Sequence, residues 1–253
     1  MSARYPSLEN RVVFITGGGS GIGAALTRAF AEQGAKVAFV DIAIEESEAL
    51  AARVAQETGN APRFIPCDIR DIEALRTAIA QVAAQSGAID VLVNNAANDQ
   101  RHDMATVTPE YWDNQMSVNL RPMFFAVQAV APGMRARKSG SIINFGSVSW
   151  MMAQGGMPSY TAAKAAVHGL TRGLARDLGD DNIRVNTLIP GWVMTERQLK
   201  LWLTPEADAE REKRQCLKLR LQPEHLASMA LFLAADDSAA CSAQEFIVDA
   251  GTV

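Results

Sequence analysis

The stretch Thr16-Gly17-Gly18-Gly19-Ser20-Gly21-Ile22-Gly23 decides the fold class, because it joins a short apolar run at residues 11–15 to an Ala-rich stretch of helical period. Glycines in such a turn let the backbone bend sharply and approach a pyrophosphate with no Cβ in the way. The start of the helix would offer free N–H groups and the positive end of its dipole to the phosphates. A glycine-rich turn is often only a turn, but its place between strand and helix predicts a dinucleotide site. The predicted cofactor-binding residues of this loop are Gly17, Ser20, Gly21, Ile22 and Gly23.

The same alternation of a short apolar run and a longer helical stretch continues along the chain. The apolar runs lie at residues 12–15, 36–40, 63–66, 91–93, 141–145, 184–188 and 245–248. Most are apolar on both faces, as the central strands of a parallel sheet are. The helical stretches lie at 23–33, 44–56, 72–85, 115–136 and 159–178. Such alternation builds right-handed βαβ units. We therefore expect an α/β fold, a single Rossmann-type, doubly wound domain over residues 1–253, with a seven-stranded parallel sheet flanked by helices on both faces.

One region interrupts the alternation. Residues 192–223 carry Arg, Lys, Glu, Trp and Leu without a strand pattern. A long insertion in a compact domain usually has a function, and this one follows the carboxyl end of a strand, where open α/β sheets bind ligands. We interpret it as a lid over the substrate. A contact between subunits is the alternative.

The composition argues against several classes of protein. The 253 residues are 48% hydrophobic and carry a net charge of −4 with no visible basic face, which argues against a nucleic-acid partner. Three lone cysteines match no zinc spacing and suit a reducing compartment. The three histidines are scattered, so no metal site is predicted. No run approaches the ~20 apolar residues of a membrane span, and residues 1–6 lack an apolar signal segment. The expected location is the cytoplasm.

Two carboxylates follow predicted strands on the cofactor side. Asp41 ends the second strand, where a carboxylate accepts hydrogen bonds from the ribose hydroxyls and repels the 2′-phosphate of NADP. No cation follows it in Ile42-Ala43-Ile44-Glu45, so the sequence favours NAD. An N-cap of the next helix is its alternative role. Asp68 follows the third strand, placed to receive the adenine amino group with Ile69 near the ring, or again to cap a helix.

Tyr160 and Lys164 lie four residues apart in a helical stretch, which puts both side chains on one face. An ammonium beside a phenol lowers a pKa that starts near ~10. Tyr160 could then take the proton of an alcohol as hydride leaves the carbon. Such pairs also occur by chance. Two further residues strengthen the prediction: Ser147 follows the upstream strand and can hold a substrate oxygen, and Asn119 lies on the long helix before that strand.

Together these motifs resemble the short-chain dehydrogenase/reductase family over the whole chain. The matching positions are residues 16–23, Asp68, Asn94-Asn95-Ala96, Asn119, Ser147, Tyr160, Lys164, Pro190-Gly191 and Thr195. The resemblance implies that Tyr160 is the general acid/base and that Ser147 orients the substrate. It implies that Lys164 binds the nicotinamide ribose and that Asn119 holds a water of a proton relay.

The resemblance also extends the predicted cofactor site and suggests an assembly. Asn95 and Ala96 would line the site, while Pro190, Val193 and Thr195 would contact the carboxamide end. The family's long helices pack between subunits, which implies a homotetramer. Ala97 stands where the family often has Gly, and one methyl is tolerated there if φ is negative. Residues 241–244 also depart from the common Thr-Gly, which weakens only the inference about assembly.

Within the family the chain looks most similar to bacterial xylose-type sugar 1-dehydrogenases, at residues 5–8, 94–102, 144–150 and 215–218. Such enzymes oxidise the anomeric hydroxyl of an aldose to a lactone. The candidate substrate-binding residues are Asn98, Ser147, Ser149, Gln154, Tyr160, Trp192 and Arg197, with Trp202 as a second stacking candidate. Asn98 and Gln154 could instead be simple loop residues.

Two alternatives stay open. A 2-keto-3-deoxy sugar acid is the rival substrate, because Arg101, His102 or Arg197 could bind its carboxylate. A catalytically silent dinucleotide-binding sensor is the alternative of another class, since a fold does not imply catalysis. All four predicted catalytic positions are filled, which favours an enzyme.

Overall fold

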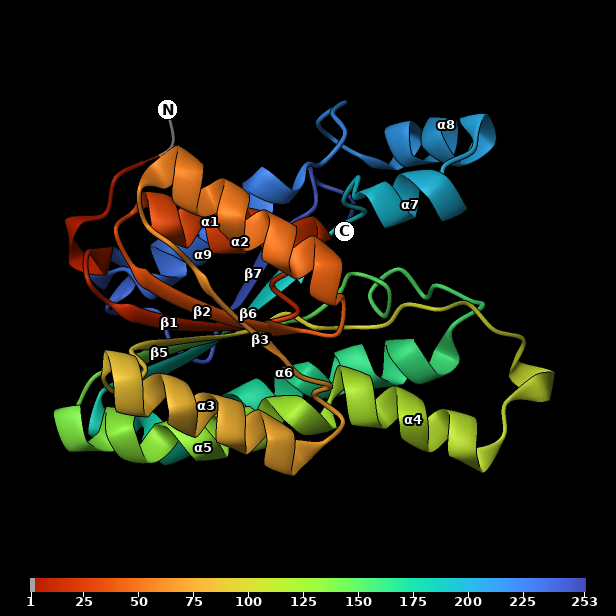
Figure 1. Cartoon of the computed structure of the whole chain (residues 1–253). Coiled ribbons are helices and arrows are strands. Elements are labelled where there is room, and N and C mark those ends of the chain that lie inside the picture. The colour runs from red at the N-terminus through yellow and green to blue at the C-terminus, as the bar shows by residue number, and fades with distance from the viewer. Residues whose placement is uncertain (1–2) are drawn as a thin grey trace.

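The computed structural model describes residues 3–253, so Met1 and Ser2, which open the segment predicted to lack a secretory signal, lie outside the described residues. Its centre is a parallel sheet in the order β3-β2-β1-β4-β5-β6-β7 (Figure 1). The strands are β1 (Val12–Thr16), β2 (Lys36–Asp41), β3 (Arg63–Pro66), β4 (Val91–Asn94), β5 (Gly140–Phe145), β6 (Ile183–Pro190) and β7 (Glu245–Val248). The predicted sheet is confirmed, with each strand end within two residues of its expected place.

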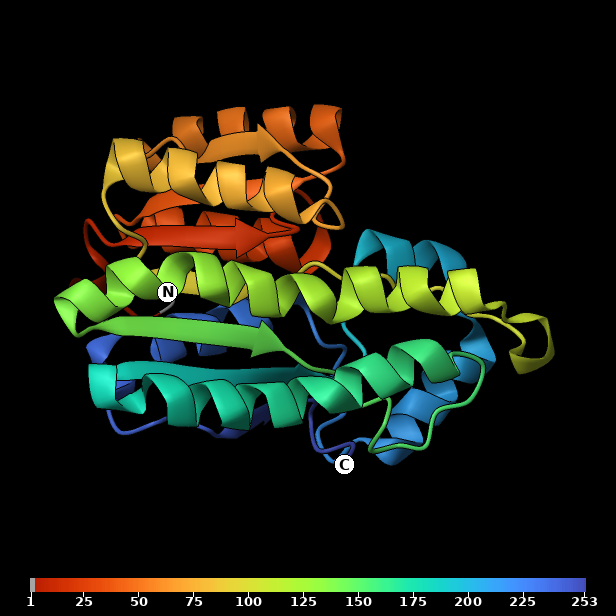
Figure 2. The same ribbon diagram turned by 90° about the horizontal axis from the view of Figure 1, so that it is seen from below.

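Helices cover both faces of this sheet (Figures 1 and 2). One face carries α1 (Gly21–Glu32), α2 (Ile44–Thr58) and α9 (Pro223–Ala234), and the other carries α3 (Ile72–Ser86), α5 (Arg121–Arg137) and α6 (Pro158–Leu178). Alternate residues of β1 enter the two halves of the core, because successive side chains of a strand point to opposite faces. Val13 and Ile15 belong to the cluster on the α1 side, while Val12 and Phe14 belong to the cluster on the α3 side. The predicted Rossmann-type domain is confirmed.

The long helix expected at residues 115–136 is wrong as a single element. The structure has α4 (Pro109–Asn119) and then α5, separated at Leu120, whose φ of −136° and ψ of −56° leave the helical region. Pro122 explains the break, because it has no N–H to donate to the carbonyl of Val118, and its ring opposes continuation of the helix. The break ends α4 at Asn119, which is fully buried.

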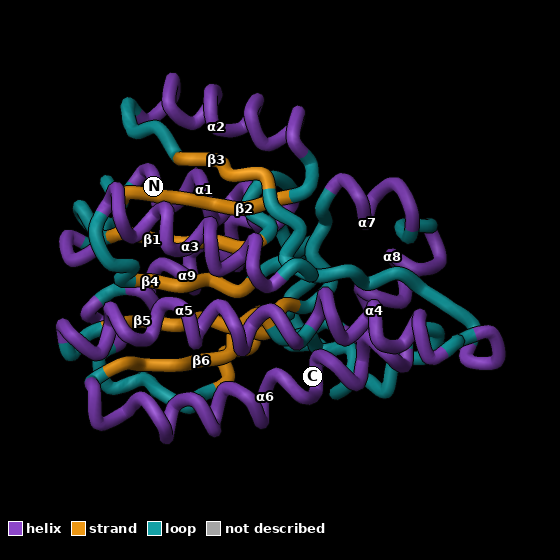
Figure 3. The backbone as a smooth tube through the Cα atoms, turned by 60° about the horizontal axis from the view of Figure 1, so that its bottom comes forward, coloured by secondary structure: helices purple, strands orange, loops and turns teal. Residues whose placement is uncertain are grey.

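The segment 192–223 is mostly helical. It contains α7 (Glu196–Leu201) and α8 (Pro205–Arg214), whose first turns are capped by the hydroxyls of Thr195 and Thr204. Its only extended pairing within residues 3–253 is an isolated bridge between Val193 and Leu221. Figure 3 places α7 and α8 beyond the carboxyl ends of the strands, on the side where α4 also projects. In the part of the chain described, no helix is both long and apolar enough to cross a membrane.

Candidate active site

The glycine loop is packed so closely that an added side chain would meet backbone atoms at Gly17 and Gly23. Gly17 has a φ of +66°, and a Cβ there would lie 2.8 Å from the Cα of Ala96. A Cβ on Gly23 would collide with the carbonyl oxygen of Gly17. The loop is thereby pressed between the start of α1 and the chain that follows β4. These two glycines serve close packing, which keeps the first turn of α1 open to the cleft.

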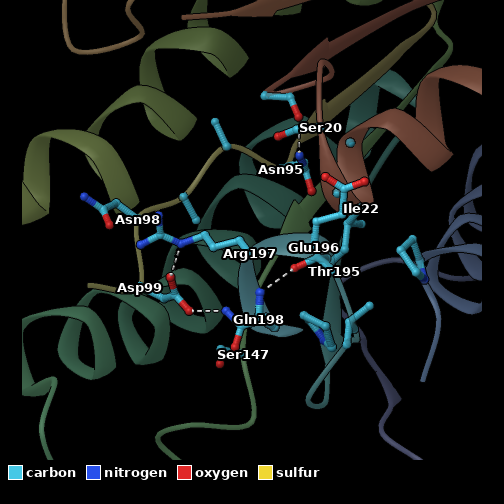
Figure 4. A pocket seen from close by; sticks show the side chains of 18 of the residues that line it. Ser20, Ile22, Asn95, Asn98, Asp99, Ser147, Thr195, Glu196, Arg197 and Gln198 are labelled. Carbon is cyan, nitrogen blue, oxygen red and sulfur yellow. Dashed lines mark hydrogen bonds and ion pairs between the residues drawn. The ribbon is translucent and has the colours of Figure 1, made fainter. Parts of the chain in front are cut away.

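The first turn of α1 has free donors. Ser20 is the N-cap residue, but its exposed side chain makes no capping hydrogen bond. The first N–H groups of a helix have no partner within the helix, and a phosphate at that position would satisfy them. Thr195 lies across from this turn, since a Cβ on Gly21 would be 3.1 Å from its Cγ2. Ser20, Gly21, Ile22 and Thr195 all line one cleft (Figure 4).

Asp41 joins the end of β2 to the glycine loop. Its Oδ2 accepts from the Gly19 N–H at 2.9 Å, and its Oδ1 accepts from the Ala43 N–H at 3.0 Å. Ala43 is the N-cap of α2, so the alternative role of Asp41 as that cap is wrong. A carboxylate oxygen has more than one acceptor site. Asp41 therefore keeps acceptor capacity for a pair of ribose hydroxyls.

Asp68 lies at the far end of the same cleft and pairs with Arg70. The Arg70 Nε lies 3.0 Å from Oδ1 and 2.9 Å from Oδ2 of Asp68. This guanidinium lowers the pKa of the Asp68 carboxyl. Asp71, and not Asp68, caps α3 by accepting from the Ala74 N–H. The capping alternative is therefore wrong, and contact of Asp68 and the buried Ile69 with adenine stays a prediction.

Asn95 and Ala96 hold the end of β4 against the glycine loop. The Asn95 Nδ2 donates to the carbonyl of Gly17 at 2.8 Å, and the N–H groups of Asn95 and Ala96 both donate to Thr16 Oγ1. Ala97 has no positive φ, so the methyl that replaces the family's common glycine is accommodated as expected. Both Asn95 and Ala96 line the cleft.

The structure brings Ser147, Tyr160 and Lys164 together at the carboxyl ends of β5 and β6. Pro158 starts α6, so Tyr160 and Lys164 follow on one helical face, with the Lys164 Nζ 5.7 Å from the centre of the Tyr160 ring. Ser147 lies close enough to the Tyr160 hydroxyl to lower its pKa. Lys164 is 1% exposed, and its Nζ donates to the carbonyl of Phe145 at 2.8 Å. This trio can hold a hydroxyl group and exchange a proton with it.

Burial shifts the two titrating groups in opposite directions. It raises the pKa of Tyr160, an effect that the nearby Ser147 hydroxyl opposes and the charge of Asp99 reinforces. It lowers the pKa of Lys164 to about 7, which the charge of Asp99 opposes. The expected lowering of the Tyr160 pKa by Lys164 is therefore wrong for this structure. Desolvation is the largest cause for both groups, and an amine with this pKa is only partly charged at neutral pH.

Asn119 is buried and clamps the loop that follows β4. Its Oδ1 accepts from the Asn98 N–H at 2.8 Å, while its Nδ2 donates to the Asn98 carbonyl and to Gln115 Oε1. Asn98 Oδ1 accepts in turn from the Gln100 N–H within the same loop. That contact matches the alternative of a loop residue for Asn98. The water-holding role of Asn119 stays a prediction.

At the substrate end, the segment 192–223 contacts the loop after β4 through a polar network (Figure 4). Asp99 accepts from Arg197 Nε at 3.2 Å and from Gln198 Nε2 at 2.6 Å. The Gln198 Oε1 accepts from the Trp192 indole N–H at 2.9 Å. Trp192 and Arg197, both predicted to bind substrate, thus form hydrogen bonds to other side chains of the protein. Asp99 and Gln198 were not predicted, because positions about a hundred residues apart leave no local sequence signal.

A second group lies beside this network. The Arg101 guanidinium lies 4.7 Å from the centre of the Trp202 ring, and Gln154, with its amide oriented to satisfy both groups, accepts from both Nη atoms of Arg101. Ser149 Oγ is buried without a hydrogen-bond partner in the described chain. His102 is held between Tyr111 and Ser159. Among the described residues Ser149 therefore keeps a free hydroxyl at the cleft, while Gln154 and Arg101 line the cleft bonded to each other.

Most of these residues line one cleft of about 1750 Å³, with Lys164 and Asn119 buried behind its wall. It runs from Asp41 and Asp68, past the glycine loop, to Tyr160 and the segment 192–223. A pocket for one small molecule measures ~300–1,000 Å³, so this cleft has room for a dinucleotide and a second small ligand. Within residues 3–253, no three His, Cys, Asp or Glu side chains are grouped as a metal would require.

Comparison with known proteins agrees with this geometry. The sequence model of a family described as Enoyl-(Acyl carrier protein) reductase matches residues 17–253. A protein of Rhizobium meliloti named "Probable galactose dehydrogenase" is 53% identical over 250 residues, covering 99% of this chain and 98% of that protein. The D-xylose 1-dehydrogenase of Caulobacter vibrioides is 51% identical with the same coverage. A solved short-chain type dehydrogenase/reductase from Mycobacterium ulcerans is 25% identical, has a TM-score of 0.92, and is matched over 97% of this chain and 90% of its own.

Dehydrogenases of this kind use a nicotinamide dinucleotide, which fits the free donors of α1 and the acceptors of Asp41. The chain belongs to the short-chain dehydrogenase/reductase family and is an oxidoreductase that acts on CH–OH groups.

Proposed function

We propose that this enzyme oxidises the C1 hydroxyl of an aldose to a lactone with NAD⁺. The observation that carries the proposal is that Ser147, Tyr160 and Lys164 lie together beside the part of the cleft that polar side chains line. A steroid or acyl chain would favour a more uniformly apolar wall. The names of the relatives, a galactose and a D-xylose dehydrogenase, support a sugar substrate.

In the proposed reaction Ser147 donates a hydrogen bond to the anomeric oxygen, and Tyr160 takes the hydroxyl proton as the C1–H bond breaks. The bound nicotinamide ring supplies the acceptor for the hydride. The sugar thus loses one proton and one hydride and becomes the lactone. When protonated, Lys164 stabilises the phenolate of Tyr160, and its bond to the Phe145 carbonyl keeps the amine in place.

Asp41 supports NAD as the dinucleotide. Its two oxygens are fixed by the N–H groups of Gly19 and Ala43 at the edge of the cleft. A fixed carboxylate there accepts from the ribose hydroxyls and repels a 2′-phosphate. Neither amide contact depends on the cofactor, so the charge is already in place before binding.

The test is reduction of NAD⁺ and NADP⁺ by the purified protein with a panel of aldoses, secondary alcohols and deoxy sugar acids. We expect turnover of at least one aldose with NAD⁺ and identification of its lactone by mass spectrometry. Turnover confined to sugar acids, or none with any sugar, would discard the aldose assignment. A matched assay of Tyr160→Phe excludes a contaminating activity.

Arg101 favours a second candidate, a 2-keto-3-deoxy sugar acid. Among the described residues it forms no ion pair with a carboxylate, whereas Arg197 is paired with Asp99. A guanidinium facing the cleft can bind a carboxylate through two hydrogen bonds. For this substrate Arg101→Gln should raise KM at least tenfold, while an aldose should lose much less. Equal losses would discard the sugar acid.

We infer further that the enzyme acts in the cytoplasm as a homotetramer with residues 192–223 as its lid. The uncrosslinked cysteines support a reducing compartment, and the exposed Trp112 and Phe124 on neighbouring helices support an interface between copies. Light scattering after size exclusion should give four chains per particle. A monomer mass would contradict the assembly and leave the chemistry intact.

A further inference from the structure

Asp99, on the loop after β4, contacts Arg197 and Gln198 of α7 (Figure 4). Its side chain is 24% exposed, and both of its oxygens are used by α7, Oδ1 by Arg197 Nε and Oδ2 by Gln198 Nε2. Gln198 is itself held by the Trp192 indole N–H and by the hydroxyl of Thr195. One carboxylate therefore joins the loop after β4 to the first turn of the lid.

The loop that carries Asp99 is rigidly anchored on the other side. The Asn119 side chain accepts from the N–H of Asn98 and donates to its carbonyl, so it fixes the backbone of the residue next to Asp99. Asn119 is fully buried at the end of α4. Motion at the Asp99 contacts is thus more easily taken up by α7, whose residues are largely exposed, than by the loop.

The charge of Asp99 also reaches the catalytic pair. It raises the pKa of Tyr160 and of Lys164, and it is the carboxylate whose charge acts on both groups. Arg197 of α7 pairs with it, and Arg101 of its own loop and Glu196 of α7 line the same cleft. Tyr160 and Lys164 of α6 are the groups whose pKa values its charge raises. Arg197 neutralises part of the charge when α7 is docked.

We propose that Asp99 is a positioning residue that fastens α7 over bound substrate and makes the protonation of the Tyr160–Lys164 pair depend on lid closure. The proposal rests on the dehydrogenase function proposed above. With α7 docked, Arg197 shields Asp99, and with α7 displaced the bare carboxylate favours protons on both catalytic groups. The base form of Tyr160 is then less disfavoured in the closed enzyme than in the open one.

Asp99→Asn keeps the size of the side chain and an oxygen for Gln198, and removes the charge. We expect KM for the sugar to rise about 5- to 30-fold, consistent with a lost contact of ~1–2 kcal/mol. We also expect the acid limb of the pH profile of kcat to move to lower pH, because the pKa values of Tyr160 and Lys164 fall when the negative charge is removed.

Arg197→Gln is the matched variant, for which we expect the pH profile of kcat to shift in the opposite direction. It breaks the same ion pair but leaves Asp99 charged, so KM should rise while the acid limb moves to higher pH. Glu212→Gln removes an exposed carboxylate of α8 and should change neither quantity. A structural role alone would raise KM in both variants and move neither limb, and that result would overturn the coupling.

A readout without sugar turnover separates this proposal from the proposed function. Hydrogen–deuterium exchange of the NAD⁺-saturated enzyme should show faster exchange of the α7 amides in Asp99→Asn than in wild type, with α6 unchanged. If no sugar is oxidised but the α7 amides of Asp99→Asn exchange faster, the aldose assignment fails and the attachment of α7 by Asp99 is supported. If α7 exchanges at the wild-type rate and KM is unchanged, Asp99 fastens nothing and the proposal is overturned.

Discussion

Tyr160 and Lys164 owe their chemistry to how little water reaches them. Burial disfavours the charged form of each group, which is the phenolate of Tyr160 and the ammonium of Lys164. The pKa of Tyr160 therefore rises, and that of Lys164 falls to about 7. Each hydrogen bond at this site therefore matters more than it would at the surface. The Ser147 hydroxyl is the neighbour that favours the phenolate.

Removal of the Tyr160 hydroxyl should remove the base and little else. We expect Tyr160→Phe to lower kcat about 10²- to 10⁴-fold, the usual range for a general acid–base group. Binding of NAD⁺, followed by calorimetry, should change by less than a factor of about three. If the variant keeps more than a tenth of wild-type kcat, another group takes the proton. Ser147→Ala serves as the companion variant, with a smaller expected loss.

The buried amine of Lys164 should destabilise the folded protein at low pH. Its folded pKa of about 7 lies below the unfolded value of 10.5, so the unfolded chain binds more protons between these values. The loss of unfolding free energy is largest below pH 7, where the amine is protonated in both states, and it becomes smaller as the pH rises. Lys164→Met should therefore be more stable than wild type at pH 6, and the difference in unfolding free energy should narrow by ~1.4 kcal/mol per unit between pH 7 and 9. Urea melts at three pH values test this, and a constant difference would contradict the buried amine.

At the scale of elements, the cofactor end depends on how the glycine loop, β2 and α2 meet. Asp41 bonds the N–H groups of Gly19 and Ala43 and so joins these elements with one carboxylate. The bonds hold the carboxylate whether or not a ribose is present. The proposed selectivity for NAD would therefore arise at this junction and not in the segment 192–223.

Asp41→Ala should relax the choice of dinucleotide. Loss of charge-assisted hydrogen bonds of ~1.5–3 kcal/mol should raise KM for NAD⁺ by about 10- to 100-fold, while KM for NADP⁺ falls or stays constant. Steady-state kinetics with both cofactors measures the change in ratio. Asp68→Ala is the control, since its carboxylate lies at the adenine end. A wild-type preference for NADP⁺ would contradict the ribose argument.

At the scale of the whole molecule, buried polar side chains form hydrogen bonds that connect three strands of the sheet with one another and with α6. Asn94 Nδ2 donates to Asn144 Oδ1, and Asn144 Nδ2 donates to Thr171 Oγ1 on α6. Thr187 on β6 donates to the same Thr171 hydroxyl. These bonds fix β4, β5, β6 and α6 relative to one another, and Ser147 follows β5 while Tyr160 lies on α6.

Asn144→Ala should therefore cost stability as well as activity. It leaves the amide of Asn94 and the hydroxyl of Thr171 poorly satisfied in the interior and opens a small cavity. We expect a loss of ~2–4 kcal/mol in unfolding free energy by urea denaturation. Asn114→Ala, which removes a surface bond to Arg70, should cost less than about 1 kcal/mol. Similar costs for the two variants would mean that the network contributes no more than a surface contact.

The elements that followed from local pattern were predictable, and those that depended on distant partners were not. Runs that are apolar on both faces located every strand within two residues. The helix break at Leu120 was missed although Pro122 signalled it, because small and apolar residues continue through both halves. Helix α9 was missed as well, despite Pro223 in its first turn and the reciprocal capping bonds of Gln222 and His225.

The sequence by itself determined the parallel sheet, the open start of α1 and the positions of Ser147, Tyr160 and Lys164, because strand polarity, helical period and glycine geometry act over a few residues. Only the tertiary structure decided what surrounds them. It placed Asp99 against Arg197 and Gln198, bonded Asn119 to Asn98, and buried Tyr160 and Lys164 deeply enough to move both pKa values. Those effects arise from desolvation and from contacts between segments far apart in the chain, which no local pattern encodes.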